Sequence, residues 1–195
     1  MGSNKGSASW LNALTIGGGT FFLALAIGYG SQAFLGRIAS LILSFALLIL
    51  IIFIGILFDI IGVAVAAADE APLHARAAKK INGARQAVWL LRHADQVASF
   101  CTDVVGDVCS TLSGAIGAAI IFRLLGHAVD KDILISTLMT AMVSATAVGG
   151  KAAGKRFALT EADTIVFFVG RILAAAEKIT GLKLFQNSGR KGKRA

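Results

Sequence analysis

Long apolar runs separated by short polar segments dominate the pattern of this chain. Residues 13–36 contain no charged side chain, and residues 38–68 contain only one, Asp59. Two further apolar runs cover about 97–122 and 133–150. A helical run of about 18 or more apolar residues is long enough to cross a hydrocarbon core of about 30 Å. The pattern therefore predicts four transmembrane helices.

The second run is longer than one crossing requires. As a single helix, residues 38–68 would extend over roughly 46 Å. Such a helix tilts, breaks near Gly62, or projects beyond the membrane. We expect its alanine-rich end to project.

The polar segment 69–95 predicts a helical hairpin beside the membrane. Pro72 suits the first turn of a helix, and Asn82-Gly83 is a typical turn dipeptide. We expect short helices over about 72–81 and 84–93, with Asp95 capping the next helix. Four basic side chains of this hairpin are expected to face lipid headgroups: Arg76, Lys79, Lys80 and Arg85.

The segment after the fourth run predicts an interfacial helix. Thr160-Glu-Ala-Asp163 fits the pattern that begins a helix, with an acidic residue in the first turn. Apolar residues then recur at helical spacing, while charged residues fall elsewhere on the wheel, which is typical of a helix lying at a membrane surface. The stripe comprises Ile165, Phe168, Val169, Ile172, Leu173 and Ala176. Residues 182–195 form a basic tail.

Composition agrees with a membrane protein. Hydrophobic residues make up 56% of the chain and charged residues 15%, whereas soluble domains carry about 25% charged residues. The pattern thus predicts an all-α membrane protein with four transmembrane helices, a juxtamembrane helical hairpin and a C-terminal amphipathic helix. No aromatic or fold signal accompanies the net charge of +8, so we expect the lipid bilayer, not nucleic acid, as its partner.

The basic residues also predict an orientation. With four spans, both termini and the hairpin share one side, which holds sixteen of the 19 Lys and Arg residues. The other side holds Arg37, Arg123 and Lys131. Cytoplasmic loops carry the excess of basic residues in membrane proteins. We therefore expect a multi-pass protein of the cell membrane with both termini in the cytoplasm.

Two acids in the third span are the candidate functional residues. Asp103 and Asp107 lie four residues apart, on one face of an α-helix. An ionised Asp at the centre of a spanning helix costs roughly 2.5–3.5 kcal/mol on insertion scales. Such residues usually face a partner, an ion or a water-filled cavity. The alternative is a position near a helix end, in contact with water.

Several segments together resemble a known transporter domain. Glu70 follows the second span in a small-residue acidic turn, and a short basic hairpin comes next. Gly106-Asp107-Val108 lies in the third span, and Gly150 and Lys155 follow the fourth with the spacing G-x-x-x-x-K. The chain over about 40–181 resembles the transmembrane domain of the CorC/cyclin-M (CNNM) family of magnesium transporters.

The resemblance implies a fold, an ion and partners. Residues 38–181 would be the family's transmembrane domain, with the hairpin at 69–95. Residues 1–37 would add one transmembrane helix, and the family's cytosolic CBS domains would be absent, leaving room for a separate cytosolic partner. The resemblance also implies a homodimer and magnesium as the bound ion. Carboxylate ligands would then come from four positions: Asp59, Asp69, Asp103 and Asp107.

The motifs depart from the family at the ligand positions. The family's Ser-x-Ser-Glu segment falls on Ala67-Ala68-Asp69-Glu70, so both serines are absent. Its Gly-Asn-Asn segment has Asp107 in place of the first Asn, and its Gly-Glu-x-x-Pro-Lys motif has Lys151 in place of Glu. A lysine beside Asp103 or Asp107 would supply the positive charge that a cation supplies elsewhere.

Three functions follow as hypotheses. The chain transports or binds a divalent cation, or it is a non-transporting scaffold or regulatory subunit in which a Lys–Asp pair replaces the cation. The third is an intramembrane aspartyl protease, because Asp59 and Val105-Gly106-Asp107 resemble the two halves of such a site. We expect a protein that is not an enzyme. Divalent-cation transport or binding is the first prediction, because the resemblance covers most of the chain, and the scaffold or regulatory subunit is the alternative.

Overall fold

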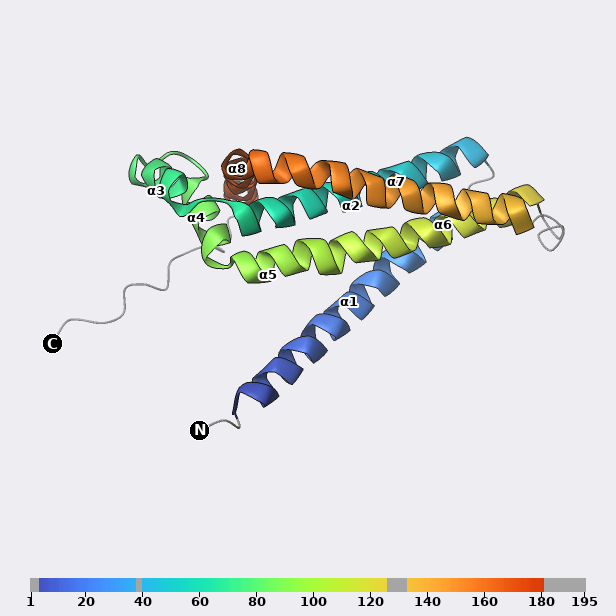
Figure 1. Ribbon diagram of the computed structural model, residues 1–195, viewed down its shortest axis with the longest axis horizontal. Coiled ribbons are helices and arrows are strands. Elements are labelled where there is room, and N and C mark those ends of the chain that lie inside the picture. The colour runs from blue at the N-terminus through green and yellow to red at the C-terminus, as the bar shows by residue number, and fades with distance from the viewer. Residues whose placement is uncertain (1–3, 38–39, 126–132, 181–195) are drawn as a thin grey trace. The chain divides into compact units, whose positions relative to one another are not determined.

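The computed structural model describes residues 4–37, 40–125 and 133–180, and the regular elements within these ranges are all helices (Figure 1). The predicted all-α class is confirmed. In chain order the helices are α1 (Asn4–Arg37), α2 (Leu41–Ala67), α3 (Glu70–Ala78), α4 (Ala84–Arg92), α5 (Ala94–Ser99), the π-helix η1 (Phe100–Gly106), α6 (Asp107–Leu125), α7 (Ile133–Thr160) and α8 (Ala162–Thr180).

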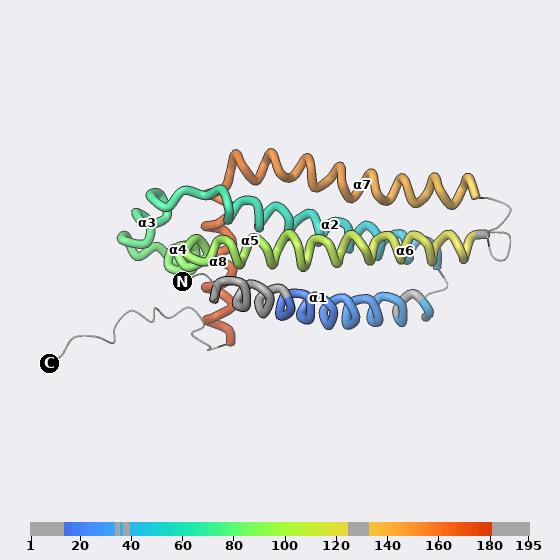
Figure 2. The backbone as a smooth tube through the Cα atoms, turned by 60° about the horizontal axis from the view of Figure 1, so that its bottom comes forward, coloured from blue at the N-terminus to red at the C-terminus, as the bar shows by residue number. Residues whose placement is uncertain are grey.

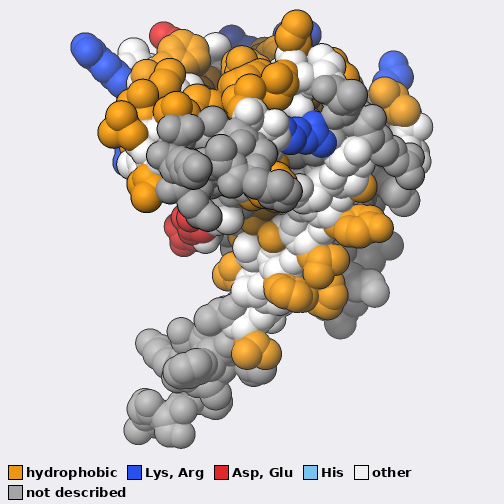
Figure 3. Space-filling model, turned by 90° about the vertical axis from the view of Figure 1, so that its right-hand side faces the viewer, with side chains coloured by type: hydrophobic (Ala, Val, Ile, Leu, Met, Phe, Trp, Pro, Cys, Tyr) orange, Lys and Arg blue, Asp and Glu red, His pale blue; other side chains and the backbone are white. Residues whose placement is uncertain are grey.

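Four helical segments are long and apolar enough to cross a membrane. They cover Leu14–Ala33, Leu41–Ala67, Ala94–Leu124 and Ile133–Thr160, which confirms the four predicted spans. Large apolar side chains are widely exposed on these helices, and Figure 3 shows hydrophobic side chains spread over one face of the molecule. A lipid bilayer is the environment that suits such a surface.

Three span boundaries differ from the sequence pattern. Helix α1 already begins at Asn4, ahead of the uncharged run. Helix α2 continues through Gly62 without a break and ends at Ala67. Helix α7 extends past Gly150 to Thr160, so Lys151 and Lys155 belong to the helix and not to a loop after it. Hydropathy located the apolar runs, but helical hydrogen bonding continues beyond them.

The chain divides into two units, and the division falls inside α2, α5 and α7. The first unit comprises residues 1–60 and 99–156. Within it, α2, α6 and α7 run alongside one another in both views (Figures 1 and 2). Helix α6 is central, and its buried residues form one core with those of α2 and α7: Leu48, Ile51, Ile52, Val108, Cys109, Leu112, Ile116, Ile120, Val143 and Ala147.

Glycines set the close approach of helices in this unit. A Cβ added at Gly55 of α2 would lie 2.8 Å from Cys109 Cβ of α6. A Cβ at Gly154 of α7 would lie 2.7 Å from Ile60 Cγ1 of α2, and one at Gly150 would overlap Ile56. Gly150 and Gly154 form a G-x-x-x-G pair, which is a known device for close helix packing in membranes.

The glycines of α1 behave differently. No neighbouring atom lies within 4 Å of a Cβ built at Gly17, Gly18 or Gly19, and α1 continues through all three. Gly28 faces α6, because a Cβ built there would lie 3.3 Å from Leu112 Cδ2.

The second unit comprises residues 61–98 and 157–195 and holds α3, α4 and α8. The predicted hairpin is confirmed, with its turn at Asn82-Gly83, where Gly83 has a φ of 88°. The turn requires glycine because L side chains rarely adopt that φ. Helix α5 begins at Ala94, so Asp95 lies in its first turn instead of preceding it as a cap.

Helix α8 packs on α4 through small residues. The buried residues of α8 are Ala162, Val166 and Gly170. A Cβ at Gly170 would lie 2.5 Å from the Gly83 carbonyl oxygen and 3.0 Å from Ala87 Cβ. The hairpin and α8 therefore form a single packed layer. The basic tail predicted over 182–195 lies outside the described residues.

The glycine contacts lead to a stability prediction. Gly154→Ala places a methyl group against Ile60 and should destabilise the protein by roughly 1–3 kcal/mol through overpacking. Gly149→Ala is the matched control, because a Cβ at Gly149 meets no atom within 4 Å. Thermal unfolding of the purified protein should show a lower midpoint for Gly154→Ala alone. Equal midpoints for the two variants would contradict close packing of α7 on α2.

Candidate charge site in the helix bundle

The third span changes its winding at the two candidate acids. Residues Phe100–Gly106 form a π-helix between α5 and α6. π-helical turns are rare and occur frequently at functional sites. The hydroxyl of Ser110 donates to the Gly106 carbonyl oxygen at 2.9 Å, which gives that carbonyl a partner at the end of the π-helix. The sequence pattern did not predict this element.

Asp103, inside the π-helix, accepts hydrogen bonds from neighbouring residues of the same span. Its Oδ2 accepts a hydrogen bond from Ser99 Oγ at 2.6 Å, and its Oδ1 accepts one from Thr102 Oγ1 at 2.9 Å. The side chain is exposed. Two hydroxyl donors satisfy part of the carboxylate without any metal or basic residue.

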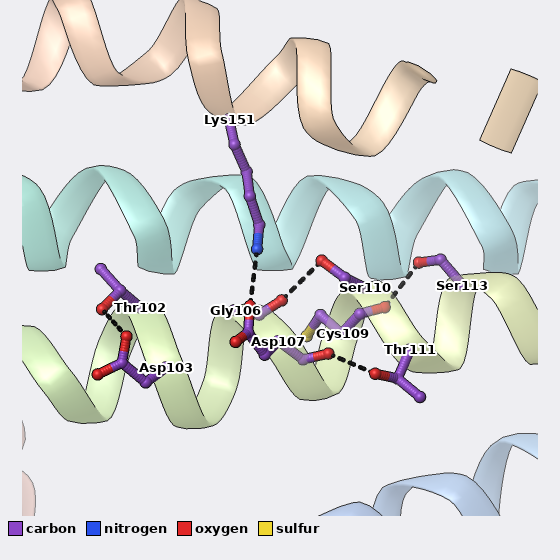
Figure 4. Close-up of polar contacts among 9 residues, drawn as sticks. All are labelled: Thr102, Asp103, Gly106, Asp107, Cys109, Ser110, Thr111, Ser113 and Lys151. Carbon is purple, nitrogen blue, oxygen red and sulfur yellow. Dashed lines mark hydrogen bonds and ion pairs between the residues drawn. The ribbon is translucent and has the colours of Figure 1, made fainter. Parts of the chain in front are cut away.

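Asp107, the first residue of α6, has a partner on another helix. Lys151 Nζ of α7 lies 3.4 Å from Asp107 Oδ1, and Figure 4 shows the lysine side chain crossing to the carboxylate. The lysine side chain is 21% exposed and the aspartate side chain 73%. The ammonium is therefore mostly enclosed by the bundle, whereas the carboxylate reaches it from the bundle surface.

Asp59 of α2 lies near the same lysine. A Cβ built at Gly106 would be 3.5 Å from Lys151 Nζ and 3.9 Å from Asp59 Oδ1. Both charged groups therefore lie beside Gly106 of the π-helix. The charged groups that act electrostatically on Asp59 are Lys151, Lys155, Asp107 and Asp103.

These five residues form the charge site: Asp59, Asp103, Asp107, Lys151 and Lys155. All five belong to the first unit. Three carboxylates and two ammonium groups leave a formal charge of −1 if all five are ionised. Asp59 lies eight residues before the end of α2 at Ala67, which is about 12 Å along the helix. Lys151 lies nine residues before the end of α7 at Thr160.

The structure does not bring the fourth candidate acid into this site. Asp69 belongs to the second unit and precedes α3. Its backbone N–H donates to Asp163 Oδ1 of α8 at 2.8 Å, so its place is in the connection between the hairpin and α8. Within the described residues, no group of three or more His, Cys, Asp or Glu side chains is arranged to hold a metal ion.

Comparison with protein-family models, with curated proteins and with solved structures finds no match to this chain. The chemistry of the site must therefore be read from its own residues.

Several residues of the site were missed in the sequence. Ser99 and Thr102 are the hydroxyl donors to Asp103, and Gly106 lies beside Lys151 and Asp59. The sequence does contain patterns that could have indicated the Ser99–Asp103 hydrogen bond and the position of Lys151. A hydroxyl residue four positions before an acid can hydrogen bond to it along a helix, and G-x-x-x-G at 150–154 places Lys151 on the helix that packs against α2.

The arrangement can balance charge within the bundle. Inside a bilayer an ionised side chain is stabilised by a counter-charge or by hydrogen bonds. Asp107 has the Lys151 ammonium, and Asp103 has two hydroxyl donors. Both acids therefore have partners within the chain.

The ion pair leads to a prediction that a double-mutant cycle can test. In lipid bilayers Lys151→Met should destabilise the protein, by up to about 3 kcal/mol, because Asp107 loses its counter-charge. Adding Asp107→Asn should restore most of the loss, since no unpaired charge remains. Chemical unfolding in vesicles measures both steps.

Asp103→Asn is the control for this cycle. It also removes a carboxylate, but that carboxylate is bonded to Ser99 and Thr102 and not to Lys151. Lys151→Met combined with Asp103→Asn should therefore stay destabilised. Wild-type stability of the single Lys151→Met variant would show that the pair contributes nothing.

Proposed function

We propose that this chain is a non-transporting membrane scaffold or regulatory subunit, built on a CorC/CNNM-like membrane domain, in which Lys151 replaces a bound cation. One observation carries the proposal, the 3.4 Å separation between Lys151 Nζ and Asp107 Oδ1. The ammonium already occupies the position beside the carboxylate that a divalent cation would need. The protein in this proposal is not an enzyme.

The chemistry of magnesium supports the proposal. Magnesium requires oxygen ligands in near-ideal octahedral geometry. The resemblance assigns ligand positions to 107 and 151, and position 151 carries an ammonium that repels a cation. The acid at position 69 is engaged through its own backbone with Asp163. A fixed ammonium balances Asp107 permanently, whereas a transported ion must leave.

Transport of a divalent cation is the second candidate. It is favoured by a second acid near the Asp107–Lys151 pair, since Asp59 Oδ1 and Lys151 Nζ both lie within 4 Å of a Cβ built at Gly106. Magnesium usually keeps several of its waters and needs only one or two carboxylates. In this alternative Lys151 moves away from Asp107 when the ion binds.

Magnesium titration separates the two candidates. The proposal predicts that millimolar magnesium leaves the thermal midpoint of the wild type unchanged, because Lys151 already supplies the charge. Lys151→Ala removes that charge and should gain a saturable, magnesium-dependent rise in midpoint. Lys151→Ala combined with Asp107→Asn should lose the gain, since the ligand is gone.

Two outcomes would overturn this proposal. A wild type that magnesium stabilises, with the effect abolished in Asp107→Asn, would establish the cation-binding candidate instead. No magnesium response in either the wild type or Lys151→Ala would show that position 151 does not replace a cation. Titration with potassium at equal ionic strength controls for salt screening.

The proposed orientation places both termini and the hairpin in the cytoplasm of a cell-membrane protein. It rests on the positive-inside rule and on the exposed basic residues of the hairpin. The resemblance adds a homodimer through the membrane helices and a separate cytosolic partner. As a regulatory subunit, the chain would act through these two contacts.

Cysteine labelling tests the orientation. Both native cysteines, Cys101 and Cys109, are buried, so the background should be low. A membrane-impermeant maleimide should label Ser40→Cys, just before α2, in intact cells. It should label Asn82→Cys, in the hairpin turn, only after the membrane is opened. Labelling in the opposite order would reverse the orientation.

A further inference from the structure

Helix α8 carries two apolar faces, of which only one has a partner among the described residues. Ala162, Val166 and Gly170 are buried, and Gly170 packs against α4. A second set of apolar side chains lies on a different side of the same helix. Phe168 is 61% exposed, Ile172 53% and Ile179 86%. Their spacing of four and seven residues places all three on one face.

The single apolar stripe expected from the sequence is thus divided. Phe168 and Ile172 belong to the exposed face, while Val169 and Leu173 are half-buried, nearer to the face that contacts the hairpin. Periodicity alone combined the two faces because both are apolar and adjacent on the helical wheel. One of them completes the packed layer, and the other is left for a different contact.

The charges of α8 are also separated. Its two acids are engaged with the hairpin side, since Asp163 accepts from the Asp69 N–H and Glu177 accepts from Gln86 Nε2 at 2.6 Å. Its two cations, Arg171 and Lys178, have exposed side chains. They lie seven residues apart and therefore follow one edge of the helix. That edge runs beside the exposed apolar face.

Chain continuity places α8 next to a membrane span. Helix α7, one of the four candidate spans, ends at Thr160, and α8 begins at Ala162. Only Glu161 separates them. The exposed apolar face is therefore joined directly to a helix whose length and composition suit the bilayer.

We propose that the exposed face of α8 inserts into the membrane surface, with Phe168, Ile172 and Ile179 in the acyl boundary and Arg171 and Lys178 on anionic headgroup phosphates. Amphipathic helices bind membranes through this combination of apolar burial and attraction to anionic lipid. The sequence predicted an interfacial helix here, but it assigned headgroup contact to the hairpin cations. One of these, Arg76, is half-buried and lies over the Phe167 ring, 4.6 Å from its centroid.

Fluorescence quenching tests which medium covers this face. In the full-length protein, Trp10 and Trp89 are replaced by Phe, and Phe168→Trp becomes the only fluorophore of its kind. In vesicles of phosphatidylcholine and phosphatidylglycerol, lipids brominated on the acyl chain should quench this probe strongly, and aqueous acrylamide weakly. Strong acrylamide quenching would show a face in water. Protection from both quenchers would show a face covered by protein, such as a second copy, and either result overturns the proposal.

A charge-matched pair of variants tests the headgroup contact. In detergent, added phosphatidylglycerol should raise the thermal midpoint of the wild type more than phosphatidylcholine does. Arg171→Gln with Lys178→Gln should abolish this difference. Lys79→Gln with Lys80→Gln removes the same net charge from the hairpin and should retain it.

Two outcomes would contradict the assignment. An equal loss in both double variants would mean that anionic lipid responds to net charge and not to the edge of α8. An equal response of the wild type to the two lipids would mean that no anionic headgroup is recognised. All four positions are exposed, so misfolding is not expected to obscure the comparison.

Discussion

An ionised acid in a membrane helix needs a counter-charge or hydrogen-bond donors, and this constraint organises the first unit of the chain. Asp107 is at the start of α6, the central helix of the unit, and Lys151 reaches it from α7 at 3.4 Å. The lysine is mostly enclosed although the acid is exposed, so the bundle holds the ammonium and presents it to the carboxylate. Asp103 is satisfied differently, through two hydroxyl groups of its own helix. The two neighbouring acids therefore have separate partners.

Close packing of α2, α6 and α7 brings Asp107 and Lys151 together. Gly154 and Gly150 allow α7 to approach the isoleucines of α2, and Gly55 allows α2 to approach Cys109 of α6. Helix association in lipid depends on such van der Waals contacts, because the bilayer offers no hydrophobic driving force between helices. The π-helix then brings Gly106 beside Lys151 and Asp59. Small residues on three helices thus determine which charges meet.

The parts of this structure that follow from local sequence were predictable. Long apolar runs gave the four spans, and Asn82-Gly83 gave the hairpin turn, because each depends on residues near one another in the chain. The pairing of Lys151 with Asp107 needed a resemblance to suggest it, since 44 residues separate them. The π-helix and the two faces of α8 could not be read from periodicity, because apolar spacing does not record hydrogen-bond register or which neighbour covers a face. The apolar run predicted the end of the fourth span at Gly150, ten residues before α7 ends at Thr160, because hydropathy falls at Lys151 while the helix continues.

The central claim is that Lys151 neutralises Asp107 inside the bilayer, where a cation would otherwise bind. Solid-state NMR can measure the distance between the Lys151 side-chain nitrogen and the Asp107 carboxyl carbon in lipid vesicles with specifically labelled protein. The account predicts a separation of about 4 Å, as an ion pair requires, both without magnesium and with millimolar magnesium. A pair that separates beyond about 6 Å when magnesium is added, out of ion-pair contact, would contradict the account and favour a cation site.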